Sequence, residues 1–159
     1  MIKMSELKEG FTALGFENVV SYINSGNLAF DTRKSGEEVL VKRIEEAVEK
    51  IVGKNVQVMV REQASIFRVL ANNPYDGQFE SHKEMHVLFL KSELSDEKKQ
   101  MLAGAVPEGE RFAIEGREIY CHLPMGVAES YLGRGKFEKM LGTSVTARNW
   151  RTVQKLAEL

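Results

Sequence analysis

The segment between residues 131 and 159 contains six basic residues and only two acidic ones. The basic residues are Arg134, Lys136, Lys139, Arg148, Arg151 and Lys155. Arg148 and Asn149 stand just before, or in the first turn of, a predicted final helix. The exposed backbone N–H groups of such a turn attract anions, and a guanidinium beside them can hold a phosphate or carboxylate in bidentate fashion. The pattern predicts a site for a small anionic ligand at Arg148 and Asn149. In the alternative interpretation both residues brace the helix while Trp150 packs in the core.

A second basic feature is the run Gly133-Arg134-Gly135-Lys136, which precedes a predicted helix. The run is similar to a phosphate-binding loop in composition, although its spacing is not that of a P-loop. Glycines at these positions can equally end one short helix and join it to the next. Because both basic segments flank the same short predicted strand, we expect Arg134 or Lys136 to share one pocket with Arg148.

The cysteine and the histidines are weaker candidates for catalysis or metal binding than the basic segments are for anion binding. Cys121 and His122 are adjacent on a predicted strand, so their side chains point to opposite faces and cannot form a thiolate–imidazole pair. Cys121 is therefore predicted to be a buried, small hydrophobic residue. His82 and His86 are four residues apart, a metal spacing only on one helix, and His86 begins a predicted strand. Neither a metal nor a cofactor is predicted.

The composition narrows the class of protein without naming a reaction. The chain has 159 residues, of which 43% are hydrophobic and 28% charged, as in a folded protein. No apolar run approaches the about 18 residues needed to span a bilayer, and the first residues lack the apolar core of a signal peptide. A single cysteine excludes an intrachain disulfide and indicates a cytoplasmic location. The net charge of −1 argues against nucleic acid or a membrane as partner.

The elements that must position these residues follow from hydrophobic periodicity. In the first half, Ser5 is predicted to cap a helix with Leu7, Phe11 and Leu14 on one face. Two strands, 19–23 and 28–31, then flank a hairpin turn at 24–27. The remaining predicted elements are a helix over 36–52, a strand over 56–60 and a helix over 63–71.

The second half begins after a polar segment. Its predicted elements are a strand over 86–90, a helix over 95–105 capped by Ser95, two strands around Gly116, helices at 127–132 and 137–141, a strand at 144–146 and a final helix. In that last helix Trp150, Val153 and Ala157 share one face, so Trp150 is predicted to be mostly buried.

The two halves show the same order of elements, which predicts an α+β fold of two ferredoxin-like βαββαβ halves at residues 1–75 and 85–159. A weak repeat supports a duplication: when Arg61 is aligned with Arg148, Val58 falls on Val145 and Ile66 on Val153. The first half lacks the opening strand.

Several blocks make the chain similar to a known family. They are Met4-Ser5-Glu6-Leu7, Tyr22-Ile23-Asn24-Ser25-Gly26-Asn27, Asn73-Pro74 and above all Thr146-Ala147-Arg148-Asn149-Trp150-Arg151-Thr152-Val153. They resemble the bacterial domain-of-unknown-function family number 1697. The resemblance implies an α+β fold of two related halves and bacterial origin, with no catalytic residues to carry over. Members usually open with a strand and a glycine-rich turn, which this chain lacks.

The missing strand is central in a ferredoxin-like unit, so its absence leaves a gap that can be resolved in three ways. The remaining strands close up, a partner chain fills the gap in a homodimer, or residues upstream of Met1 belong to the natural protein. For function, the residues favour a non-catalytic module that binds an anionic ligand. The alternatives are a small enzyme acting on such a ligand, and a structural or interaction protein that uses open sheet edges.

Overall fold

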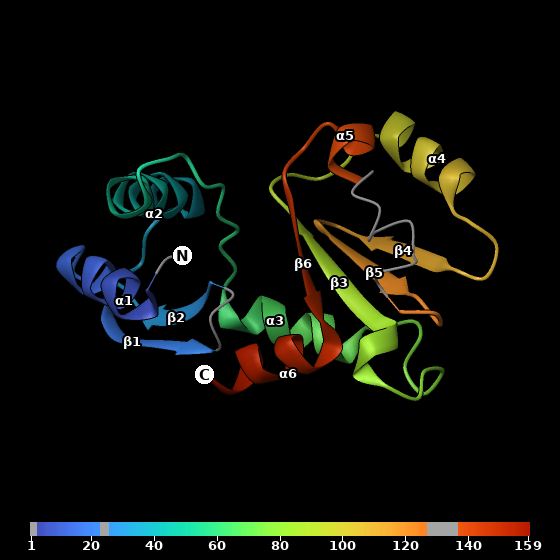
Figure 1. Cartoon of the computed structure of the whole chain (residues 1–159), viewed down its shortest axis with the longest axis horizontal. Helices are drawn as coiled ribbons and strands as arrows, with labels where there is room; N and C mark the ends of the chain where they lie inside the picture. The colour runs from blue at the N-terminus through green and yellow to red at the C-terminus, as the bar shows by residue number, and fades with distance from the viewer. Residues whose placement is uncertain (1–2, 23–25, 127–136) are drawn as a thin grey trace. The chain divides into compact units, whose positions relative to one another are not determined.

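The computed structural model describes residues 3–22, 26–126 and 137–159, and these residues form an α+β fold with two antiparallel sheets (Figure 1). The chain divides into two compact units. Residues Met1–Ile66 and Lys155–Leu159 make up the first unit, and Phe67–Gln154 the second. The contacts thus divide the chain near Ile66, whereas the sequence places the boundary in the polar segment 75–84. The predicted division into ferredoxin-like halves at residues 1–75 and 85–159 stays a prediction.

The first unit contains α1 (Met4–Ala13), β1 (Glu17–Tyr22), β2 (Asn27–Asp31), α2 (Glu37–Val52) and the start of α3 (Gln63–Ala71). β1 and β2 form the predicted hairpin, with Tyr22 opposite Asn27. The turn residues 23–25 lie outside the described residues. The predicted cap at Ser5 is wrong: α1 begins at Met4, and Lys3 precedes it without a side-chain cap. Packing of an apolar face, rather than capping, holds this helix in place.

The core of the first unit joins α1 and α2 to the hairpin. Its buried members are Leu7, Phe11, Phe16, Leu40, Ile44 and Val48. Phe30 of β2 stacks on Phe16 with ring centroids 4.2 Å apart and meets Phe11 edge to face at 5.5 Å. The α2 periodicity predicted from the sequence is confirmed, because Leu40, Ile44 and Val48 are the buried residues of that helix.

The segment 56–60 differs from its prediction. Val56, Val58 and Val60 pack against the first core, as their alternation predicts. The segment nevertheless belongs to no sheet, and the first sheet holds only β1 and β2 among the described residues. The strand predicted here is therefore wrong, and β2 does not pair with this segment.

The second unit follows the predicted order of elements. It contains the end of α3, a short 3-10 helix at His82–Glu84, β3 (Met85–Leu90), α4 (Asp96–Ala105), β4 (Arg111–Glu115), β5 (Glu118–His122), α5 (Phe137–Leu141), β6 (Val145–Asn149) and the start of α6 (Trp150–Glu158). From β3 to β6 this is the βαββαβ order. All pairings are antiparallel, in the order β4-β5-β3-β6 (Figure 1). The helix predicted at 127–132 lies outside the described residues.

One face of this sheet packs on α4 and α5. The buried cluster consists of Leu88, Leu90, Leu94, Leu102, Ile119, Cys121, Leu123 and Leu141. β3 lies between β5 and β6, and all six of its residues are buried. The predicted cap of α4 is confirmed, because the Ser95 hydroxyl accepts the Lys98 N–H at 3.2 Å.

The other sheet face meets the loop before β3 and the ends of two helices. The Tyr120 hydroxyl donates to the Val69 carbonyl at 2.7 Å. Trp150 meets Phe79 edge to face, with ring centroids 6.1 Å apart. Trp150 is 7% exposed, Val153 is fully buried and Ala157 is buried too. The predicted buried face of the final helix is therefore confirmed. No helix in the described parts of the chain is long and apolar enough to cross a membrane.

Candidate functional site

Arg148 lies near the end of β6, just before α6, as predicted. Its register partner on β3 is Val87, and Val87 also pairs with Tyr120 on β5, so the three residues share one sheet face. The Arg148 Nη1 atom donates to the Thr146 hydroxyl at 3.1 Å and to the Ala147 carbonyl at 2.8 Å. Burial lowers the pKa of Arg148 below its usual range.

Asn149 follows Arg148 but performs a different task. Its Oδ1 atom accepts the Thr152 N–H at 2.9 Å, which satisfies one free donor in the first turn of α6. Asn149 pairs with His86, so it faces the opposite side of the sheet from Arg148. The structure thus gives Asn149 the helix-capping role of the alternative interpretation. Arg134 and Lys136 lie outside the described residues, so their place near Arg148 stays a prediction.

The internal repeat gives Arg148 a counterpart in the first unit. Arg61 stands two residues before α3, as Arg148 stands two before α6. Its Nη1 donates to the preceding carbonyl, Val60, at 2.9 Å, the same contact that Arg148 makes with Ala147. Arg61 also meets a carboxylate oxygen of Glu37 at 3.7 Å, while its own side chain is 6% exposed. The repeat therefore places an arginine before a helix twice, and the Glu37 carboxylate is a partner of the arginine in the first unit.

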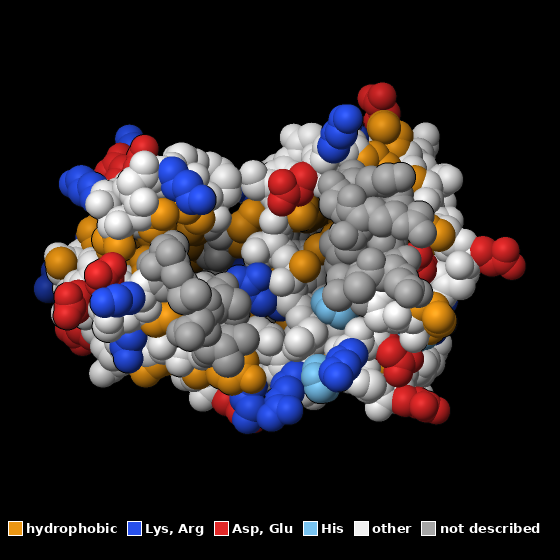
Figure 2. Space-filling view, in the orientation of Figure 1, with side chains coloured by type: hydrophobic (Ala, Val, Ile, Leu, Met, Phe, Trp, Pro, Cys, Tyr) orange, Lys and Arg blue, Asp and Glu red, His pale blue; other side chains and the backbone are white. Residues whose placement is uncertain are grey.

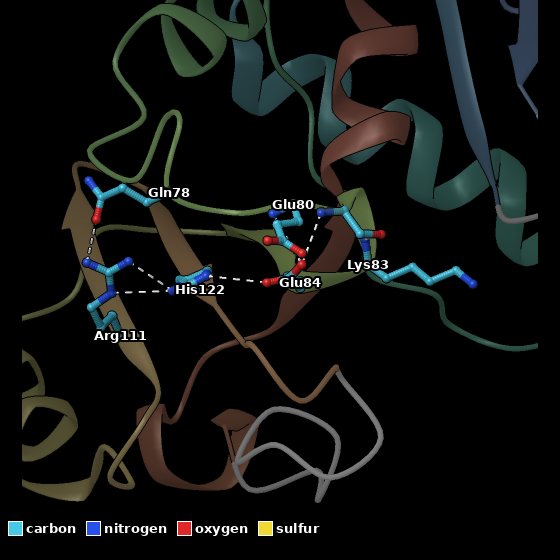
Figure 3. A network of polar contacts seen from close by, with 7 residues as sticks. Gln78, Glu80, Lys83, Glu84, Arg111 and His122 are labelled. Carbon is cyan, nitrogen blue, oxygen red and sulfur yellow. Dashed lines mark hydrogen bonds and ion pairs between the residues drawn. The ribbon is translucent and has the colours of Figure 1, made fainter.

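A polar cluster that the sequence analysis did not identify lies at one end of the second sheet (Figure 3). Arg111 on β4 is opposite His122 on β5, and its Nε and Nη2 atoms lie 3.3 and 3.0 Å from the His122 Nδ1 atom. Its Nη1 donates to the Gln78 side-chain oxygen at 2.7 Å. The guanidinium also lies over the Tyr75 ring, 4.5 Å from its centroid. These contacts hold the loop before β3 to the sheet.

The contacts of His122 determine its protonation. Arg111 has only donors, so the His122 Nδ1 atom must accept, and the ring proton of the neutral form resides on Nε2. That nitrogen is buried without a hydrogen bond among the described residues and lies 3.9 Å from Glu84 Oε1. Burial and the Arg111 charge lower the pKa of His122, which Glu84 raises in part. The cluster therefore favours a neutral imidazole.

Part of this cluster could have been found in the sequence. Ser81 and Glu84 have the spacing of a capping box, and both of its hydrogen bonds are present around the short helix. The hairpin around Gly116 also implies that a residue of β4 faces His122. What the sequence does not contain is the fold of the loop that brings Tyr75 and Gln78 to the same place.

The remaining candidate residues for catalysis or metal binding are buried. Cys121 is fully buried in the apolar cluster, and burial raises the pKa of its thiol, so the prediction of a structural cysteine is confirmed. His86 is 8% exposed, and burial together with the charge of His82 lowers its pKa. No cluster of three metal-ligating side chains occurs within residues 3–22, 26–126 and 137–159.

The first unit has a surface cleft of about 580 Å³ between the ends of α1 and β2, lined by three basic and two acidic side chains: Arg33, Lys34, Arg43, Glu17 and Asp31. Several of these groups already have partners. Arg43 donates to the Leu14 carbonyl, and its guanidinium lies over the Phe16 ring. Asp31 accepts from the Asn18 amide at 2.8 Å. The mixed charge gives this cleft no preference for an anion.

The two buried histidines predict a loss of stability in acid. Because the pKa values of His86 and His122 are lowered in the folded chain, the unfolded chain binds protons at these positions more tightly. Their contribution to the free energy of unfolding is complete above about pH 6.5, the ordinary pKa of histidine in an unfolded chain. As the pH falls below this value, the free energy of unfolding decreases by at most about 1.4 kcal/mol per histidine and pH unit. Urea unfolding at pH 7.5 and 5.5 should show this decrease. The double variant His86→Gln, His122→Gln should flatten it, and an unchanged slope would contradict the prediction.

Comparisons with known proteins agree with the fold. A solved structure of a conserved bacterial protein from Streptococcus pneumoniae matches with a TM-score of 0.74 and 21% identity, covering 99% of this chain and 88% of that one. At this level of identity the likeness concerns the fold. None of the curated proteins compared with the chain matches it significantly.

A family model described as a protein of unknown function, DUF1697, matches residues 1–120, which is most of the chain and includes all of the first sheet and most of the second. The resemblance seen in the sequence is thereby confirmed, and the chain belongs to the DUF1697 family.

Proposed function

We propose that the second unit is a binding module for a small anionic ligand, such as a phosphate-bearing metabolite, held at Arg148. The observation that carries the proposal is the place of this half-buried guanidinium near the end of β6, directly before the first turn of α6. A cation in this state gains more from an anion than a fully hydrated cation does, because the local dielectric constant is low.

The internal counterpart supports the same conclusion. In the first unit, the Glu37 carboxylate lies 3.7 Å from Arg61, at the position that corresponds to Arg148. A negative group therefore occupies this environment in one of the two repeats. The backbone N–H groups at the start of α6 add positive potential beside Arg148, and Asn149 holds that first turn in shape.

The test compares the effect of anions on thermal unfolding. At equal ionic strength, phosphate or sulfate at about ten times its dissociation constant should raise the melting temperature by about 3–6 °C relative to chloride. Arg148→Ala should abolish this increment. Arg151→Ala is the matched control, because it removes the same charge from an exposed position three residues along, at the start of α6.

The increment in each variant is measured against its own melting temperature in chloride, so a loss of stability caused by the substitution does not affect the result. An Arg148→Ala protein that keeps the full increment would contradict the proposal. Equal losses in Arg148→Ala and Arg151→Ala would indicate a general charge effect instead.

A further inference from the structure

The loop of residues 72–84, which precedes β3, is attached to one end of the second sheet through Arg111. The Arg111 Nη1 atom donates to the Gln78 side-chain oxygen at 2.7 Å, and the guanidinium lies 4.5 Å from the centroid of the Tyr75 ring. Within the loop, the Tyr75 carbonyl accepts the Gln78 N–H at 2.9 Å, and the Asn73 Oδ1 atom accepts the Tyr75 N–H at 2.9 Å. The loop therefore has hydrogen bonds of its own, and side-chain contacts with Arg111 attach it to the sheet.

The position of Arg111 depends on a neutral His122. Two guanidinium nitrogens lie 3.3 and 3.0 Å from the His122 Nδ1 atom, which must accept because a guanidinium has only donors. In the cationic form of histidine both ring nitrogens carry a proton. A proton on Nδ1 sets one donor against another and adds a second positive charge within hydrogen-bond distance. Protonation of His122 is therefore incompatible with the position that Arg111 occupies.

A carboxylate lies on the other side of the imidazole ring (Figure 3). The Glu84 Oε1 atom is 3.9 Å from the His122 Nε2 atom, too far for a hydrogen bond. The Oε2 atom of the same carboxylate accepts the backbone N–H groups of Glu80 and Ser81 at 3.2 and 3.0 Å, which fixes Glu84 at the short helix. A cationic His122 is thus attracted by Glu84 and repelled by Arg111, and both forces favour the same movement of the ring.

The surroundings of His122 make this response local. In the described parts of the chain, the charged or titratable side chains that face His122 are Arg111 from β4, Glu84 from the short helix and Tyr75 from the loop. Met85, which is opposite His122 on β3, is apolar. On the face seen in Figure 2, acidic and basic side chains are scattered over the second unit rather than gathered in one patch. A change of partner at His122, rather than the field of a large charged surface, therefore couples the loop to pH.

We propose that protonation of His122 detaches residues 72–84 from the second sheet while the sheet itself stays folded. The core against α4 and α5 lies on the opposite face of the sheet from His122, so the movement leaves it intact. Once the loop has detached, water reaches the ring, and His122 takes up a proton with the ordinary pKa of about 6.5. Below that pH, the ratio of detached to attached loop rises by up to tenfold per pH unit.

Trp150 reports the state of the loop, because the loop residue Phe79 meets its ring edge to face at 6.1 Å. Trp150 is the only tryptophan and is 7% exposed. The experiment measures quenching of its fluorescence by acrylamide, which is uncharged and therefore insensitive to surface charge. Between about pH 7.5 and about pH 5.5 the quenching constant should rise at least about twofold, because the ordinary histidine pKa lies inside this interval. Far-ultraviolet circular dichroism should stay unchanged over the same interval.

Three variants assign the response to His122. His122→Asn cannot titrate in this range but keeps a side-chain oxygen that can accept from Arg111, so its quenching constant should be the same at both pH values. His86→Gln is the matched control, because it removes the other buried histidine of this sheet, which lies on the opposite face, and it should keep the full response. Arg111→Met removes the attachment itself and should give the high quenching constant at both pH values.

A pH response that the parent and His86→Gln share and that His122→Asn lacks supports the proposal. A response that persists in His122→Asn, or a parent protein whose quenching constant does not change with pH, would overturn it. A loss of the circular dichroism signal that parallels the rise in quenching would overturn it as well, because the loop would then leave the sheet only when the whole unit unfolds.

Discussion

Replacing Trp150 with alanine should lower the free energy of unfolding by about 3–5 kcal/mol, the usual cost of removing a buried aromatic side chain. Trp150 is 7% exposed, lies against Phe79 and begins the helix that carries the fully buried Val153. Its removal opens a cavity where the chain passes from β6 to α6. Because Trp150 is the only tryptophan, urea unfolding of the variant must be followed by circular dichroism rather than by fluorescence.

The neighbouring Arg151 provides the control, because its side chain is exposed on the same turn. Arg151→Ala should change the free energy of unfolding by no more than about 0.5 kcal/mol. If Trp150→Ala cost less than about 1 kcal/mol, the tryptophan would not be a core residue. A role of Trp150 in stacking against a ligand would then be tested by the same anion titrations as for Arg148, extended to nucleotides.

The second large effect is expected at Leu102, where alanine should cost about 2–5 kcal/mol. Leu102 is 1% exposed and is the buried residue of α4, so this side chain anchors the helix to the second sheet. The neighbouring Met101 is 43% exposed, and Met101→Ala supplies a matched control that should change stability by no more than about 0.5 kcal/mol.

Urea unfolding followed by circular dichroism measures both variants. Similar losses for Leu102→Ala and Met101→Ala would mean that the buried face of α4 is not what holds this helix to the second sheet. A small loss of unfolding free energy for Leu102→Ala would mean that contacts other than those of α4 stabilise the second unit.

The elements that the sequence predicts well are those whose signals are local. The bounds of α3 and the cap of α4 at Ser95 follow from side-chain periodicity and capping chemistry within a few residues. The segment 56–60 shows the limit. Its alternation indicates which side chains face the core, and this is confirmed, but alternation does not say which strand its backbone pairs with. Pairing depends on a neighbour distant in the sequence.

In the candidate site, too, the features with local signals are predicted and those that depend on distant residues are not. The place of Arg148 before the last helix is local and is predicted, whereas the capping role of Asn149 required the structure to decide between two interpretations. The cluster around His122 joins residues from the loop before β3, from β4 and from β5. No short motif contains such a cluster, so sequence patterns alone do not predict it.

The last five residues of the chain belong to the first unit, although the whole second unit lies between them and the rest of that unit. Gln63 at the start of α3 donates from its side-chain amide to the Ala157 and Leu159 carbonyls at 3.0 and 3.1 Å. A ribosome makes these residues after the second unit, and domains generally fold as they emerge. The N-terminal unit thus receives its last contacts after the unit that follows it has been synthesised, so the order of synthesis and the order of completion are opposite.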